Sequence, residues 1–118
     1  MDIVGPAKIL RIYIGESDKW RGKPLSTALL LRLREEGLAG ATVLRAVEGF
    51  GANSRIHTAH VLRLSEDLPI VVEVVDRSDR IEHVLPIVDK MVGDGLVTVA
   101  DVEIVNSRAR QRSAPADA

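Results

Sequence analysis

The sequence contains no cysteine, few aromatic residues and no long apolar run. Without cysteine there is no disulfide framework, no thiolate nucleophile and no cysteine-based zinc site. Because aromatic residues make up only 3% of the 118 residues, the core must be built from Leu, Ile, Val and Ala. The longest apolar runs fall far short of the roughly 20 residues that a membrane-spanning helix needs. We therefore expect a soluble protein.

The chain also lacks an excess of charge of either sign. Lys and Arg total 16 and Asp and Glu total 17, so the formal net charge is −1. This balance leaves no electrostatic footprint for nucleic acid, and we expect none to bind. The first residues, MDIVGPAKIL, lack the basic start and long apolar region of a signal peptide. A cytoplasmic location is the expectation.

Apolar periodicity predicts a single domain over residues 1–105, followed by a polar, flexible tail over 106–118. Four segments rich in alternating or β-branched apolar residues are expected to be strands: 7–14, 41–48, 70–76 and 96–105. A first helix is expected from Pro24, which suits a first turn, to Gly37 as the C′ residue.

The second helix follows the third predicted strand. Ser78 or Asp79 is expected to cap it, in a capping-box pattern completed by Glu82. Pro86 predicts either a kink or a helix that begins only around residue 83, because an interior proline removes a helical hydrogen bond.

This order of elements is βαββαβ, the α+β arrangement called ferredoxin-like, with two helices on one face of a four-stranded antiparallel sheet. Apolar residues occupy both faces of the predicted strands. One alternating set is expected to project away from the helices: Ile9, Tyr13, Val43, Val47, Val71, Val75, Val97 and Val99. A face of that kind predicts a partner, and self-association is the simplest choice.

The only tryptophan, Trp20, lies in a charged connector, GESDKWRGK. Two interpretations remain open. Trp20 folds back as a lid over the first helix, with its indole N–H toward solvent, or it lines a cleft between subunits together with Glu16, Lys19 and neighbouring charges. The alternation of acidic and basic groups suits subunit salt bridges as well as ligand binding.

The connection over residues 49–69 is unusually long for a compact domain, and such loops are functional or disordered. Residues 50–60 are expected to be mobile. Phe50, at the base of the connection, is interpreted as a packing anchor, with a ring that stacks on a ligand as the alternative. His57 and His60 suggest a metal site, but no third ligand has an obvious spacing, so no metal is expected.

No motif for catalysis is present. The sequence has no nucleophile elbow, no HExxH and no Walker A lysine. Nothing positions a partner for an acid or base, so we expect a protein that is not an enzyme.

Several separate segments together resemble the DUF190 family, within the PII-like superfamily of small trimeric regulators. They are YIGESDKW, GKPL, GLAGATVLRAVEGFG, SRIHTAHVLRLSEDLPIVVEVVD and GDGLVT, in that order. The resemblance implies a ferredoxin-like protomer, a homotrimer with its sheets facing inward and a mobile loop between the second and third strands. It also implies a small molecule, commonly an adenine nucleotide, in clefts between subunits.

The resemblance carries over unevenly to individual residues. Gly93, Asp94 and Gly95 match the first three positions of a Gly-Asp-Gly-Lys loop that wraps phosphate in PII proteins. Leu96 replaces the lysine of that loop, so AMP or ADP is expected to bind at least as well as ATP. Another anion is an alternative ligand, and Gly-Asp-Gly is also common as a simple turn between a helix and a strand. Two further candidates for charge partners of the ligand are Arg45 and Arg55, and Arg108 and Arg110 lie near a region where PII proteins place arginines from the neighbouring subunit.

The resemblance implies a ligand-responsive regulatory trimer whose loop contacts another protein. For PII relatives that partner is often a membrane transport protein, so an ion channel or transporter is a candidate. The alternative is a metal- or anion-binding trimer without a signalling role, as in the CutA relatives.

Overall fold

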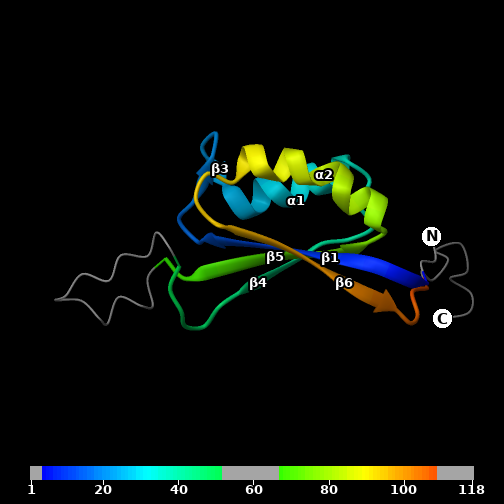
Figure 1. The fold of residues 1–118 in the computed structure, drawn as a ribbon. Helices are drawn as coiled ribbons and strands as arrows, with labels where there is room; N and C mark the ends of the chain where they lie inside the picture. The colour runs from blue at the N-terminus through cyan, green and yellow to red at the C-terminus, as the bar shows by residue number, and fades with distance from the viewer. Residues whose placement is uncertain (1–3, 52–66, 109–118) are drawn as a thin grey trace, which may run out of the picture.

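The computed structural model describes residues 4–51 and 67–108. Figure 1 shows two helices lying on one face of a twisted sheet. The elements are, in chain order, β1 (Gly5–Gly15), β2 (Lys19–Trp20), β3 (Lys23–Pro24), α1 (Leu25–Glu35), β4 (Thr42–Arg45), β5 (Pro69–Asp76), α2 (Ser78–Met91) and β6 (Leu96–Ile104). The predicted ferredoxin-like arrangement is confirmed, with a small hairpin inserted between β1 and α1.

The main sheet has the strand order β4-β5-β1-β6. The central strand β1 pairs antiparallel with β5 on one side and β6 on the other, and β4 pairs antiparallel with β5 at the edge. The strand predicted over 41–48 is twice as long as the observed strand β4, which has four residues. Residues 42–45 of the predicted strand pair with residues 70–73 of β5.

The core lies between the sheet and the two helices. It consists mainly of Leu, Ile and Val side chains, together with Ala28 and Met91, as the scarcity of aromatic residues requires. The fully buried members are Leu10, Ile12, Val72, Val74, Leu29, Leu33, Ile81, Val84 and Val88. Each such side chain contributes about 1.5–3 kcal/mol through its removal from water.

Helix α1 ends as the sequence predicts. Gly37 has φ +88°, a left-handed conformation that glycine adopts without steric cost. The N–H of Leu38 bonds to the carbonyl of Leu33 at 3.2 Å, and the N–H of Gly37 bonds to that of Arg34 at 3.1 Å. These two bonds form a Schellman motif. Pro24 differs slightly from the expectation, because it is the N-cap residue and ends β3.

The predicted start of helix α2 is wrong in detail. Ser78 is the first helical residue and Arg77 is the N-cap, so neither Ser78 nor Asp79 caps the helix through its side chain. The helix also continues through Pro86 to Met91 instead of beginning near residue 83. Pro86 is tolerated because the carbonyl that loses its partner belongs to an exposed turn of the helix, where water can bond to it.

Asp76 fixes the start of α2 from inside the protein. This residue is 0% exposed. Its Oδ1 accepts a hydrogen bond from the N–H of Arg77 at 2.7 Å, and its Oδ2 accepts one from the N–H of Ala39 at 2.8 Å. Arg80 Nη1 lies 3.8 Å from Oδ1. The carboxylate thus ties the junction of β5 and α2 to the loop that follows α1.

The second face of the sheet has no helix over it, and we call it the open face. Residues that pair across two strands point to the same face of the sheet, so the strand register shows which residues lie on the open face. Ile9 pairs with Val75, and Tyr13 pairs with Val71. These four residues lie on the open face, as expected. Val75 there is 38% exposed.

The remaining members of the predicted set do not share that face. Val97 pairs with Ile12 of the core, and Val43 and Val99 likewise pair with core residues. All three therefore point toward the helices. Val47 lies beyond β4 and is 94% exposed. The predicted phase is wrong in these strands, because apolar residues occupy both faces and only pairing distinguishes them.

One ion pair lies in the middle of the open face. Arg11 Nε is 2.9 Å from Glu73 Oε2, and the two residues are cross-strand partners in β1 and β5. Around this pair the face is largely apolar, with Leu44 48% exposed and Leu96 57% exposed. The open face therefore combines an apolar surface with a single central pair of charges.

Candidate functional site

A pocket of about 420 Å³ lies at the end of the sheet where β1 finishes. It is surrounded by the end of β1, the start of the β1–β2 loop, both ends of the connection between β4 and β5, and the loop before β6. Tyr13, Phe50 and Leu96 supply apolar side chains to its lining, and three aspartates supply carboxylates: Asp18, Asp67 and Asp94. The predicted Gly-Asp-Gly loop thus contributes Asp94 and Gly95 directly to a cavity.

The two glycines of this loop have different reasons to be glycine. A Cβ at Gly95 would lie 2.6 Å from the carbonyl oxygen of Tyr13 and 2.9 Å from Cγ1 of Val92. Gly95 is therefore required by the close approach of the loop to β1. A Cβ at Gly93 would meet no atom within 4 Å. Only Gly93 has open space beside its backbone, where an anion can approach.

Two of the three carboxylates hold the pocket together. Asp18 Oδ2 accepts a hydrogen bond from the N–H of Gly15 at 2.9 Å. Asp67 Oδ1 accepts bonds from Ser17, from its N–H at 2.8 Å and from its hydroxyl at 2.7 Å. Asp94 forms no hydrogen bond or ion pair with any other residue in the described part of the chain. Its carboxylate remains available for a ligand's donor groups.

Glu16 and Arg45 form an ion pair with each other. The backbone places both beside the pocket, because the N–H of Glu16 bonds to the carbonyl of Leu68 at 3.0 Å and the N–H of Ala46 bonds to that of Pro69 at 2.9 Å. The structure therefore brings two predicted site residues together at the edge of the pocket. In this arrangement Arg45 is neutralised by its partner.

Of the two interpretations of Phe50, the packing anchor is wrong, and the structure favours the alternative of a ring beside a ligand pocket. Its side chain is 65% exposed and lines the pocket. Within the described residues, Phe50 belongs neither to the core cluster nor to the partly buried residues that pack against it. An exposed aromatic ring beside a cavity is suited to stacking on a planar ligand.

Trp20 lies in a different place. Lys19–Trp20 pairs with Lys23–Pro24 in a hairpin whose two turn residues, Arg21 and Gly22, both have positive φ. That is the signature of a tight type I′ turn. Trp20 packs partly buried against the core and lines a groove between the helices, as a lid would. The pocket beside Gly95 includes neither Trp20 nor Lys19.

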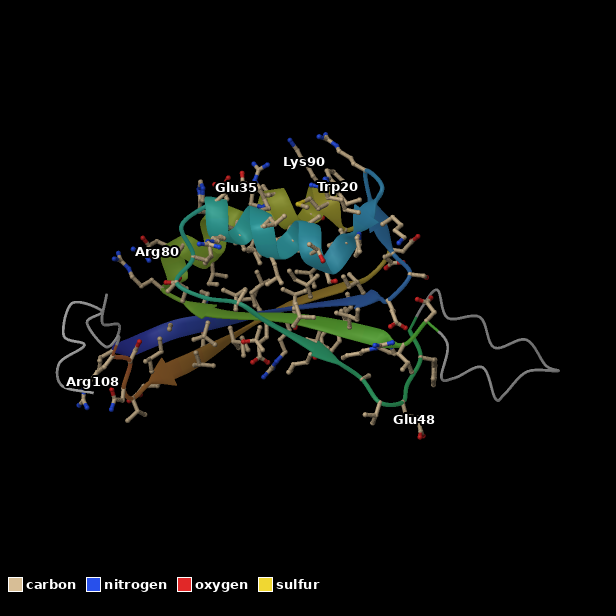
Figure 2. All side chains as sticks on the ribbon, turned by 180° about the vertical axis from the view of Figure 1, so that it is seen from behind. Trp20, Glu35, Glu48, Arg80, Lys90 and Arg108 are labelled. Carbon is tan, nitrogen blue, oxygen red and sulfur yellow. The ribbon has the colours of Figure 1, made fainter. Side chains whose placement is uncertain are left out.

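The pocket has no cation of its own among the described residues. None of its lining residues is Lys, Arg or His. Arg108 follows β6, whose nine residues span about 30 Å from the pocket end. Figure 2 shows Arg108 and Glu48 at opposite ends of the sheet. Arg55 and Arg110, like His57 and His60, lie outside the described residues.

The titratable groups with shifted pKa values lie away from the pocket. A hydrogen bond from His83 lowers the pKa of Glu36, although partial desolvation opposes it. The hydrogen bond between Lys8 and Asp101, at 2.8 Å, raises the pKa of the lysine and lowers that of the aspartate. These are surface ion pairs on the helices and strands, and none of them indicates a catalytic group.

Neither a metal cluster nor a membrane-spanning helix occurs in the described segments. Residues 4–51 and 67–108 contain no group of three or more His, Cys, Asp or Glu side chains placed to hold a metal ion. Within the same ranges, neither helix has the length and apolar character needed to cross a membrane.

Comparison with solved structures places the fold among PII-like proteins. The chain is similar to a PII-like signalling protein from Thermus thermophilus, with a TM-score of 0.61, 18% identity and coverage of 86% of this chain and 92% of that one. It is also similar to CPII, a nitrogen regulatory PII-like protein from Thiomonas intermedia, with a TM-score of 0.58, 21% identity and coverage of 86% and 91%. That CPII structure is bound to ADP, AMP and bicarbonate.

Sequence comparison identifies closer relatives. A UPF0166 protein from Aquifex aeolicus is 40% identical over 98 residues, which cover 83% of this chain and 92% of the relative. A UPF0166 protein from Methanocaldococcus jannaschii is 34% identical over 99 residues, covering 83% and 91%. The profile of the family DUF190, described as Uncharacterized ACR, matches residues 7–104. The chain therefore belongs to the DUF190 family and has a PII-like, ferredoxin-like fold.

Proposed function

We propose that this protein is a PII-like regulator that binds AMP or ADP in the pocket beside the 93–95 loop. One observation carries the proposal: the loop that resembles a phosphate-binding loop borders a real cavity of about 420 Å³. That volume falls within the range of small-molecule sites. The fold shared with CPII, which binds ADP and AMP, supports the same ligand class.

The chemistry of the lining favours few phosphates. Three carboxylates and no described cation surround the cavity. A like charge about 6 Å away costs about 1–3 kcal/mol at an effective dielectric constant between 80 and 20. Each additional phosphate charge therefore weakens binding, and Leu96 replaces the lysine that would offset it. The ring of Phe50 lines the cavity and would stack on a base, and the open backbone at Gly93, next to the lining residues Asp94 and Gly95, would receive one anionic group.

A homotrimer with its sheets facing inward belongs to this proposal. The open face is broadly apolar, and three copies meeting there would cover it. A neighbouring copy would also be the source of a cation, because Arg108 cannot reach the pocket of its own chain. Light scattering should give three times the chain mass of 12.8 kDa. A stable monomer at micromolar concentration would contradict it.

The output of such a regulator is a protein contact rather than a reaction. We propose no catalytic activity and a cytoplasmic location, where adenine nucleotides report energy state. The connection over residues 49–69, whose two ends border the pocket, would contact a membrane transport protein such as an ion channel or transporter. Ligand and partner would then influence each other through the same stretch of backbone.

Titration calorimetry with AMP, ADP and ATP tests the ligand. We expect AMP or ADP to bind at least as tightly as ATP. Gly93 does not line the pocket but directly precedes the lining residue Asp94. In Gly93→Val the new side chain would occupy the open space through which we propose that the anionic group approaches the loop, so binding should weaken at least tenfold. Gly40→Val is the matched control, since a Cβ there also meets nothing within 4 Å and Gly40 lies at the opposite end of the sheet.

Two results would contradict the proposal. A strong preference for ATP would mean that another cation replaces the missing lysine. Absence of binding by all three nucleotides, with the oligomer intact, would favour the alternative of an anion- or metal-binding trimer without a signalling role. Bicarbonate and divalent metal ions are the probes for that alternative.

A further inference from the structure

A second cavity, of about 570 Å³, lies on the outer side of the helical layer, and we call it the helix groove. Side chains from both helices form its apolar floor: Ala28 and Leu31 of α1, and Pro86, Ile87 and Met91 of α2. Trp20, in the β2–β3 hairpin, closes one end. The helix groove shares no lining residue with the pocket beside Gly95.

The shape of the helix groove follows from the residues at its floor. Ala28 is small and Pro86 is short, so the space between the two helices is not filled from above. Leu31 is 46% exposed there. The groove thus presents apolar surface to solvent between two rigid helices.

The rim of the helix groove is cationic, although the whole chain carries a net charge of −1. Four cationic side chains and one carboxylate line it: Arg21, Lys23, Arg32, Lys90 and Glu35. Arg32 bonds to Glu36 at 3.0 Å. Lys23, Lys90 and Arg21 form no ion pair within residues 4–51 and 67–108. Figure 2 shows Lys90, Trp20 and Glu35 on the same outer side of the helices.

One cation on this rim is held in place. The guanidinium of Arg21 lies 5.1 Å from the centre of the Trp20 ring, within the range of a cation–π contact. Arg21 itself is fixed by the type I′ turn, in which its φ is +49°. The hairpin therefore presents the Arg21 guanidinium beside Trp20 at one end of the groove.

We infer that the helix groove binds an acidic amphipathic peptide segment of a partner protein. Apolar side chains of the peptide would cover Leu31, Ile87 and Met91, and its carboxylates would pair with Lys23 and Lys90. This is the mode in which an amphipathic helix enters a groove. The groove is open along both helices and has cations at the hairpin and on each helix. A long helical peptide fits this shape better than a small molecule, which binds in more enclosed sites.

The helix groove lies on the face of the molecule opposite the open face of the sheet. Figure 1 shows both helices on one side of the sheet, so an assembly through the open face would leave the helices that line the groove uncovered. The inference depends neither on the nucleotide nor on the trimer, so its failure and theirs are separate results.

Trp20 provides a direct test, because it is the only tryptophan and lines the groove. Two synthetic 14-residue helical peptides serve as probes, with Leu at positions i, i+3, i+4 and i+7 and either Glu or Lys elsewhere. We expect the Glu peptide to shift Trp20 emission to shorter wavelength and to perturb amide signals of Leu31 and Ile87 by NMR. Raising NaCl from 50 to 300 mM should weaken binding several-fold.

Charge reversal supplies the matched variants. The double substitution Lys23→Glu and Lys90→Glu should weaken binding of the Glu peptide at least tenfold. Arg34→Glu, an exposed residue of α1 that does not line the groove, should change the affinity by less than twofold. The double variant should melt and bind AMP or ADP like the wild type, because both lysines are exposed and neither lines the nucleotide pocket.

Three outcomes would overturn the inference. One is equal binding of the Lys peptide. Another is an affinity for the Glu peptide that the double charge reversal leaves unchanged. The third is binding of benzoate, a small aromatic carboxylate, as tightly as the peptide, which would assign the groove to a small molecule.

Discussion

Gly95 offers the sharpest test of how the 93–95 loop is built. In Gly95→Ala the new Cβ would lie 2.6 Å from the carbonyl oxygen of Tyr13 and 2.9 Å from Cγ1 of Val92. The carbonyl belongs to the central strand, where Tyr13 pairs with both Val71 and Leu96, so it cannot move without disturbing the sheet. Overpacking of this kind costs about 1–3 kcal/mol, and a rigid backbone neighbour favours the upper half of that range.

Gly93→Ala is the comparison that isolates this contact. A Cβ at Gly93 meets nothing within 4 Å, and its φ is not in the left-handed region. We expect this variant to stay within about 0.5 kcal/mol of the wild type. Both substitutions remove the same backbone freedom from the unfolded chain, so their difference reports the steric contact alone.

Urea unfolding followed by circular dichroism measures both variants, at one fixed protein concentration because assembly alters apparent stability. We expect the midpoint of Gly95→Ala to fall with an unchanged m-value and its Tm to drop by about 5–15 °C. Equal stability of the two alanine variants would refute the close approach of the loop to β1. Such a result would also indicate that glycine is required at position 95 for ligand binding and not for packing.

Further predictions concern the charged groups. Asp76→Ala should lower the free energy of unfolding by about 2–5 kcal/mol, because it leaves two backbone N–H donors without their buried acceptor; a loss below about 1 kcal/mol in urea unfolding would contradict this. A double-mutant cycle with Arg11→Ala and Glu73→Ala should give a coupling of about 0.2–1 kcal/mol if the open face is in water and clearly more if copies cover it. His83→Leu should raise the pKa of Glu36 toward its ordinary 4.5, measured by carboxylate NMR. Because the folded pKa of Glu36 is lowered, its stabilising contribution is complete above that ordinary value and is lost as pH falls through the folded one.

The order and type of the main elements followed from periodicity because each strand and helix carries enough apolar residues to define its period. The phase of the strands did not follow. Val43, Val97 and Val99 alternate as well as Ile9 does, and only their hydrogen-bonded partners show that they face the helices. Strand pairing is a long-range property that a local pattern does not contain.

Short-range details failed for a different reason. The hairpin around Arg21 and Gly22 is only two residues deep on each side, so no alternation marks it. A glycine at its second turn position was the available signal. The start of α2 was misplaced because the acceptor nearby, Asp76, is buried and belongs to the preceding strand.

In the candidate site, too, the sequence identified some residues, and others depended on the folded structure. The resemblance located Gly93, Asp94 and Gly95, and the structure places two of them at a pocket. No local pattern could bring Phe50 and Asp67 together at that pocket, since they come from the two ends of a connection that meet only in the folded chain. Trp20 was predicted as a candidate member of the ligand site, but the structure places it in the helix groove, away from the pocket beside the 93–95 loop.

The distance between the pocket and Arg108 has a thermodynamic consequence. If a neighbouring chain completes the site, ligand binding and assembly are linked equilibria, and each strengthens the other by the same free energy. A ligand present at about 100 times its dissociation constant would then stabilise the assembled state by about 2.7 kcal/mol per site. Dilution would favour separated chains and weaken the apparent affinity of the protein for the nucleotide. The cellular concentration of the protein would therefore set the nucleotide concentration to which it responds.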